Sequence, residues 1–278
     1  MLVDNLRKRA EIVRGIRRFF DERGFVEVET PVRIAAPAPE CHIDCPPVAT
    51  GGYLRASPEL QMKKLLAAGM DRIYQIGPCF RDGESGSRHN PEFTMVEWYR
   101  RDADYMDIAA DLEALLEGLS GNARKAERIT VREAYTRFAG WDPWVDWDQD
   151  RFDFDMATKI EPAIGELGGG VFLTDYPAQA ASLALLRGDV AERWEFYLDG
   201  MELANCFSEL CDGLEQLRRF ESAKAERRAL GEADYPLDMD FIEAVPAMRR
   251  AAGVALGVDR LVMSLVGAKT IGETRVMP

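Results

Sequence analysis

The part of the chain richest in chemically useful side chains is a polar, glycine-containing stretch between two apolar segments. It reads Arg81-Asp82-Gly83-Glu84-Ser85-Gly86-Ser87-Arg88-His89-Asn90, and Phe93 follows closely. The planar fork of arginine binds pairs of phosphate oxygens, and a phenylalanine ring stacks on a purine. These residue types favour a site for a nucleoside triphosphate, although a solvated loop with ordinary surface charges has the same composition.

Two further segments carry groups that suit the same ligand. Glu195 and Glu202 lie on the arms of an expected hairpin that turns at Asp199-Gly200. One or two carboxylates commonly hold Mg²⁺ against substrate phosphates. Gly257 and Arg260 end a small-residue strand, where glycine lets a ligand approach the backbone. Taken singly, these segments also fit two exposed glutamates and a packed strand–helix junction.

The elements that must position these groups follow from periodicity and turn residues. Strands are expected over residues 25–30, 53–56, 72–80, 92–100, 171–174, 194–198, 202–205 and 253–257. Helices are expected over residues 5–23, 57–66, 107–119, 212–229, 238–244, 246–250 and 259–266, whereas residues 121–168 show little pattern. Hairpin-joined strands with helices between them predict an α+β fold, an antiparallel β-sheet flanked by helices, in a single domain 1–278.

Composition and charge narrow the possible partners. The formal net charge is −13, which disfavours tRNA or another polyanion as a partner. The sequence contains no apolar run of membrane-spanning length and no signal peptide, so we expect a cytoplasmic protein without a membrane partner. Cys41, His42 and Cys45 lie close together, but their spacing and the presence of two histidines in all disfavour a zinc site.

The order of these segments provides a family resemblance. They resemble motif 2, the late acidic strand and motif 3 of class II aminoacyl-tRNA synthetases. The preceding helix, strand and Pro31 are similar to motif 1, the dimerisation motif, so a homodimer is expected. Residues 88–99 and 205–210 resemble the lysyl-tRNA synthetase form specifically. The resemblance covers nearly the whole chain and implies a class II catalytic fold that uses ATP and Mg²⁺ to form an aminoacyl-adenylate.

The resemblance also implies roles for matching residues. Arg81 and Arg260 would be catalytic, because they would stabilise charge on the reacting phosphates. The residues implied to bind ATP are Arg81, Glu84, Arg88, His89, Asn90, Phe93, Glu195, Glu202, Gly257 and Arg260; Glu195 and Glu202 would hold the metal. Those implied to line the amino-acid pocket are Ser57, Glu59, Glu97, Tyr99, Asn205, Phe207, Glu209 and Ala255.

Two details refine the expected substrate. Three carboxylates around one pocket suit a diamino acid such as lysine or (R)-β-lysine, because buried ammonium groups need such partners. Gly83 stands where lysyl-tRNA synthetases carry the glutamate that contacts adenine, so Glu84 or a backbone group would take over that contact.

The expected acceptor follows from what the chain contains. It starts at the motif 1 helix, with no anticodon-binding barrel before it. It most resembles the free-standing paralogues of lysyl-tRNA synthetase, which attach (R)-β-lysine to a lysine of translation elongation factor P, and Ala255 replaces a synthetase glycine as in those paralogues. Alternatives are a truncated or partner-dependent lysyl-tRNA synthetase, a non-catalytic binding module, and an amidating enzyme resembling asparagine synthetase A.

Overall fold

The computed structural model describes residues 1–41, 43–121 and 126–277, and its helices and strands are interspersed along the chain. The α-helices are α1 (Leu2–Asp21), α2 (Glu59–Ala67), α3 (Tyr105–Ser120), α4 (Val131–Ala134), α5 (Gln149–Asp155), α6 (Glu161–Leu167), α7 (Gly213–Leu230), α8 (Met239–Ala244) and α9 (Val258–Val266). The strands are β1 (Val26–Glu27), β2 (Arg33–Ile34), β3 (Tyr53–Leu54), β4 (Arg72–Phe80), β5 (Glu92–Arg101), β6 (Glu127–Thr130), β7 (Gly170–Pro177), β8 (Leu186–Arg187), β9 (Val190–Leu198), β10 (Met201–Ser208) and β11 (Ala251–Gly257).

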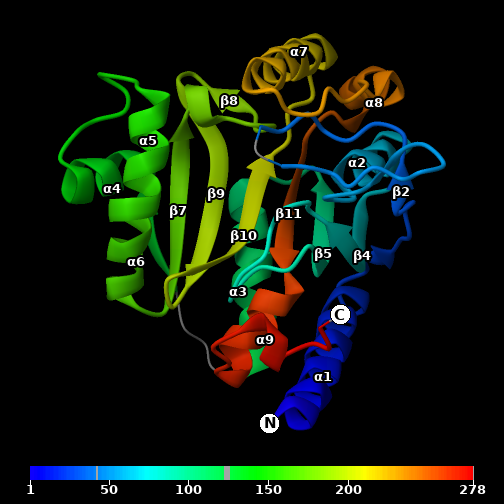
Figure 1. The fold of residues 1–278 in the computed structure, drawn as a ribbon, viewed down its shortest axis with the longest axis vertical. Helices are drawn as coiled ribbons and strands as arrows, with labels where there is room; N and C mark the ends of the chain where they lie inside the picture. The colour runs from blue at the N-terminus through cyan, green and yellow to red at the C-terminus, as the bar shows by residue number, and fades with distance from the viewer. Residues whose placement is uncertain (42, 122–125, 278) are drawn as a thin grey trace.

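Within these described residues, one sheet of nine strands forms the centre of the molecule (Figure 1). Its order is β1-β4-β5-β11-β10-β9-β7-β6, and β8 pairs with β9. The expected antiparallel sheet is confirmed from β4 to β7. The two outer pairs, β1 with β4 and β6 with β7, are parallel. Both are joined by long connections that carry helices, which parallel pairing requires.

Alternation along β5 separates the two faces of the sheet. Val96 and Trp98 point into a core that α1, α3 and α9 cover. Glu97 and Tyr99 point to the opposite face, over which α2 packs. In Figure 1, α3 lies behind the sheet, α4 to α6 flank the β7 side, and α7 and α8 cover one end of the strands. Because successive strand residues alternate between faces, Glu97 and Tyr99 face away from the core that contains Val96 and Trp98.

Several segments differ from the sequence prediction. The expected helix 246–250 is a short 3₁₀-helix over Val245–Met248, because Arg249 adopts a φ of 62° and β11 begins two residues later. The expected strand 25–30 is reduced to β1, because the backbone N–H and C=O of Thr30 bond to the side chains of Gln75 and Arg55 instead of a neighbouring strand. Residues 126–168 contain β6 and α4 to α6 rather than an unpatterned stretch. Two π-helical segments, Tyr135–Ala139 and Met156–Ile160, interrupt this region. They shift the helical period and so hide the pattern that a 3.6-residue repeat would give.

None of the helices formed by the described residues has the length and apolar character that crossing a membrane requires.

Candidate active site

The register of the sheet places predicted site residues in two neighbouring rows. One row runs across five strands through Gln75, Glu97, Ala255, Asn205 and Glu195. Directly paired residues project from the same face of a sheet. Glu97, Ala255 and Asn205, predicted from separate motifs, therefore become lateral neighbours.

The second row contains Gly253, which was not among the predicted site residues. It runs through Ile73, Tyr99, Gly253, Phe207 and Arg193. A Cβ atom on Gly253 would lie 2.0 Å from Cδ1 of Tyr99, so the Tyr99 ring lies directly over the glycine backbone. Only glycine leaves room for the ring at this place.

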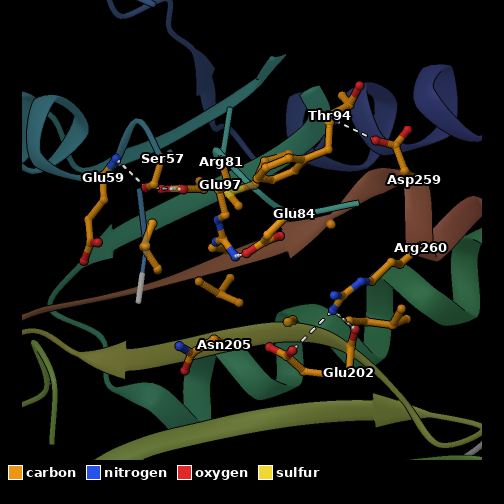
Figure 2. A pocket seen from close by; sticks show the side chains of 18 of the residues that line it. Ser57, Glu59, Arg81, Glu84, Thr94, Glu97, Glu202, Asn205, Asp259 and Arg260 are labelled. Carbon is orange, nitrogen blue, oxygen red and sulfur yellow. Dashed lines mark hydrogen bonds and ion pairs between the residues drawn. The ribbon is translucent and has the colours of Figure 1, made fainter. Parts of the chain in front are cut away.

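A cavity of about 300 Å³ opens over these rows. Its lining includes every predicted site residue except Glu195. Ser57 and Glu59 lie on one side, Arg260 and Glu202 on the other, and Arg81 lies between them (Figure 2). The cavity thus joins the segments predicted to bind an amino acid and those predicted to bind a nucleotide.

The carboxylate of Glu97 is held at the floor of the cavity. Oε1 accepts a hydrogen bond from Ser57 Oγ at 2.7 Å, and Oε2 accepts one from Tyr99 Oη at 2.7 Å. Ser57 also accepts the backbone N–H of Glu59 where α2 begins, as expected of a residue at a helix start. Burial, reinforced by the nearby Glu59, raises the pKa of Glu97 to about 7, although the two hydroxyl groups oppose this shift.

Lys63 is a functional candidate that the prediction missed. Its buried ammonium lies 2.6 Å from Glu59 Oε1 and also forms an ion pair with Glu209. Burial raises the pKa of Glu209 to about 8 despite this lysine. Its Oε1 is buried without a hydrogen-bond partner among the described residues, which is the arrangement that a bound cation would satisfy. The Glu59-to-Lys63 spacing of four residues on a helix was the available signal.

At the other side of the cavity, Arg81 lies over Phe93, and Arg260 lies beside Glu202 and His89. The guanidinium of Arg81 lies 5.2 Å from the centre of the Phe93 ring, and Arg81 Nε is buried without a partner among the described residues. Arg260 donates to the backbone oxygen of Glu202 at 2.9 Å and contacts His89 Nε2. Burial and the charge of Arg260 lower the pKa of His89.

The loop after β4 explains the glycine that departs from the synthetase pattern. Gly83 has a φ of 76°, a left-handed conformation that favours glycine. The neighbouring Glu84 lines the cavity, and its Oε1 lies 3.5 Å from Arg81 Nη1. Glu84 is therefore placed where it can contact a ligand, while residue 83 shapes the turn.

The two predicted metal ligands lie in different surroundings. Glu202 lines the cavity, and burial together with the charge of Glu195 raises its pKa. Glu195 does not line it, because Arg193 holds its Oε1 at 2.6 Å and Tyr197 Oη donates to its Oε2 at 2.7 Å. Both carboxylates project from the same face, since Glu202 pairs with Tyr197 two residues from Glu195. Two mutually repelling carboxylates fit a divalent cation, which relieves their repulsion, and each oxygen keeps a free lone pair.

The cysteine cluster gives no indication of a metal. Cys41 and Cys45 carry free thiols whose pKa values burial raises, which disfavours the thiolate that zinc requires. His42 lies outside the described residues. Among those described, no group of three or more His, Cys, Asp or Glu side chains is arranged to hold a metal ion.

The fold and the cavity define a class II synthetase-type catalytic domain, in which an antiparallel sheet carries the site on one face. The family model described as tRNA synthetases class II (D, K and N) matches residues 1–278, and the chain belongs to this family. It is 39% identical to the elongation factor P–(R)-β-lysine ligase of Yersinia enterocolitica serotype O:8 / biotype 1B over 99% of this chain and 95% of that protein. It is 38% identical to the proteins of the same name from Proteus mirabilis, over 99% and 95%, and from Mannheimia succiniciproducens, over 98% and 94%.

Proposed function

We propose that this chain is an ATP-dependent ligase that activates (R)-β-lysine or lysine as an aminoacyl-adenylate and transfers it to the ε-amino group of a lysine on elongation factor P. The relatives bearing that name, which match along nearly their whole length, support the acceptor. The single observation that supports the substrate class is the buried, unpartnered Oε1 of Glu209 beside Glu59 and Glu97. A side-chain ammonium group satisfies that oxygen, whereas a neutral side chain leaves it unpaired.

The adenylation step needs no protein nucleophile. The substrate carboxylate attacks the α-phosphorus of ATP, the bond to the β-phosphate oxygen breaks, and pyrophosphate leaves. Arg81 is proposed to bind the α-phosphate through its free Nε, and Arg260 the γ-phosphate, so that both stabilise charge developing on the phosphoryl oxygens. The Phe93 ring is proposed to stack on adenine. Glu84 and the loop backbone would contact the polar edge of the adenine ring.

The remaining polar residues of the cavity orient the reactants in this proposal. Arg88, His89 and Asn90 line the cavity beside Arg260 and would face the distal phosphates. The lowered pKa of His89 keeps its ring neutral at pH 7, so it donates a hydrogen bond without adding charge. Gly257 lets a ligand approach the β11 backbone. Holding the amino acid and ATP in contact supplies part of the rate enhancement of adenylation.

Glu202 and Glu195 are the proposed ligands of Mg²⁺. The raised pKa of Glu202, caused by burial and Glu195, is the observation that favours a cation there. When bound, Mg²⁺ neutralises phosphate charge and makes pyrophosphate a better leaving group. Arg193 positions the Glu195 carboxylate through their 2.6 Å hydrogen bond.

The test separates activation from transfer. Purified protein with ATP, Mg²⁺ and either lysine or (R)-β-lysine is assayed for pyrophosphate exchange, and intact-mass analysis then follows elongation factor P. We expect exchange with a diamino acid but not with norleucine, and one added lysyl or β-lysyl group on elongation factor P. Labelling of tRNA alone would establish the aminoacylating alternative and refute the proposed acceptor.

A homodimer is proposed on the likeness of the α1 region to motif 1. Leu2, Val3 and Val26 are exposed on and beside α1 and offer apolar surface to a second copy. Sedimentation equilibrium at micromolar concentration tests this, with a mass near 31.2 kDa contradicting it.

A further inference from the structure

Glu40 extends into the active-site cavity from the segment between β2 and β3. It lines the cavity, and its side chain is partly exposed. The segment is fixed from outside: the fully buried Arg227 of α7 donates to the backbone oxygen of Glu40 at 2.7 Å and pairs with Asp44 at 2.6 Å. Tyr235 Oη accepts the backbone N–H of Cys45 at 2.8 Å. These bonds hold Glu40 over the cavity rather than leaving it on a loose loop.

Glu40 differs from the other cavity carboxylates in having no partner. Among the described residues, nothing forms a hydrogen bond or ion pair with its carboxylate, whereas every other carboxylate lining the cavity has such a partner. Their partners are Lys63 for Glu59 and Glu209, Ser57 and Tyr99 for Glu97, Arg81 for Glu84, Arg260 for Glu202, and Arg9 and Arg275 for Asp259. A carboxylate without a structural partner is free to exchange a proton with a ligand.

The charges that act on Glu40 come from both sides of the cavity. They are Glu59 and Lys63 of α2, Arg81 after β4, and Arg193 of β9. Burial and then Glu59 raise the pKa of Glu40 to about 7, while the three cations oppose the shift. Glu40 therefore shares one cavity with Glu59 of the amino-acid pocket and with Arg81 of the proposed α-phosphate site, and its carboxylate interacts with the charge of both.

We propose that Glu40 is the general base of the transfer step, a role that rests on the proposed function. The acceptor lysine enters as an ammonium group and gives one proton to the Glu40 carboxylate. Its nitrogen lone pair then attacks the carbonyl carbon of the adenylate. The C–N bond forms, the C–O bond of the mixed anhydride breaks, and AMP leaves with that electron pair on its phosphate oxygen. The second nitrogen proton passes to water as the amide forms.

Two properties suit Glu40 to this step. Its partial exposure lets an acceptor side chain reach it from solvent. A general base works best when its pKa lies near the working pH.

The experiment compares Glu40→Gln and Glu40→Asp with the unchanged protein in three assays: pyrophosphate exchange, single-turnover transfer to elongation factor P, and trapping of the adenylate by hydroxylamine. Hydroxylamine is largely unprotonated at neutral pH and needs no base. For Glu40→Gln we expect the ratio of transfer rate to exchange rate to fall about 100-fold or more, hydroxamate formation to keep pace with exchange, and the acidic limb of the transfer pH profile to disappear. Glu40→Asp restores part of the transfer rate.

The possible failures are distinguishable. If Glu40→Gln raises the amino-acid KM and slows exchange and transfer equally, Glu40 binds the substrate ammonium and the proposal is wrong. An unchanged ratio, or hydroxamate formation that falls with transfer, also overturns it. If the unchanged protein forms hydroxamate but never modifies elongation factor P, the proposed acceptor fails, and the role of Glu40 fails with it.

Discussion

Replacing Gly253 by alanine tests how the sheet builds the amino-acid pocket. The new Cβ would lie 2.0 Å from Cδ1 and 2.2 Å from Cε1 of Tyr99. Comfortable carbon contacts are about 3.5 Å or longer, so the ring must move by about 1.5 Å. Tyr99 is only 3% exposed, and its hydroxyl holds Glu97 at 2.7 Å. Movement of the ring breaks that hydrogen bond and disturbs the cavity that Tyr99 lines.

The expected cost combines two terms. Overpacking a core costs about 1–3 kcal/mol, and losing a buried hydrogen bond costs about 1–3 kcal/mol. We expect Gly253→Ala to lower the free energy of unfolding by about 2–6 kcal/mol and Tm by about 5–15 °C. The KM for the diamino acid in pyrophosphate exchange should rise as well. Urea denaturation followed by tryptophan fluorescence measures the first quantity.

A double-mutant cycle identifies the cause. In a Tyr99→Ala background, the cost of Gly253→Ala should shrink by at least about 1 kcal/mol, because the clash is gone. Gly118 provides the matched control: it is exposed in α3 with nothing near a new Cβ, so Gly118→Ala should raise stability by up to about 1 kcal/mol. Equal costs in both backgrounds would refute the proposed contact.

Four further outcomes follow from the charges in the cavity. Lys63→Met removes the buried cation beside Glu209, so the free energy of unfolding at pH 7.5 should fall by about 3–5 kcal/mol in urea titrations, with a smaller loss at pH 5.5, where the carboxyl groups are protonated. The pKa values of Glu97 and Glu209, raised to about 7 and 8 from 4.5, mean that the folded protein binds protons more tightly than the unfolded chain; its stability should therefore decline as pH rises from about 4.5 to 8. A bound diamino acid should displace these protons, which calorimetry in buffers of different ionisation enthalpy detects as proton release near pH 7. Glu202→Gln should raise the Mg²⁺ concentration for half-maximal exchange by about tenfold or more, and an unchanged Mg²⁺ dependence would remove Glu202 from the metal site.

Much of the sheet could be predicted because its signals are local. The expected strand 72–80 coincides with β4, and the predicted hairpin turn is confirmed: Asp199 and Gly200 have φ angles of 50° and 73°, which a tight turn between β9 and β10 requires. Residues 126–168 escaped prediction because their helices are short and joined by π-helical segments. The parallel pairing of the edge strands escaped prediction because strand order depends on contacts between distant segments.

The site was predictable in its composition but not in its charge pairing. The family motifs identified the residues that line the cavity, and the sheet register brings them together. No motif indicated that Lys63 joins Glu59 to Glu209, because this depends on which face of α2 packs against the sheet. Likewise, Arg193 holds Glu195 because residues two apart on a strand share a face, and only the fold shows which face meets the cavity.

Lys63 also determines what the pocket can distinguish. It neutralises part of the charge of Glu59 and Glu209 and leaves one buried oxygen of Glu209 without a partner among the described residues. An unsatisfied buried group costs about 1–3 kcal/mol, so a ligand that supplies an ammonium group there gains about 5- to 150-fold over a neutral side chain of the same shape. Without Lys63, Glu59 and Glu209 would both lose their cation, and a single bound ammonium group would have to serve both. The buried lysine therefore lets one unpaired oxygen, rather than overall negative charge, select the substrate.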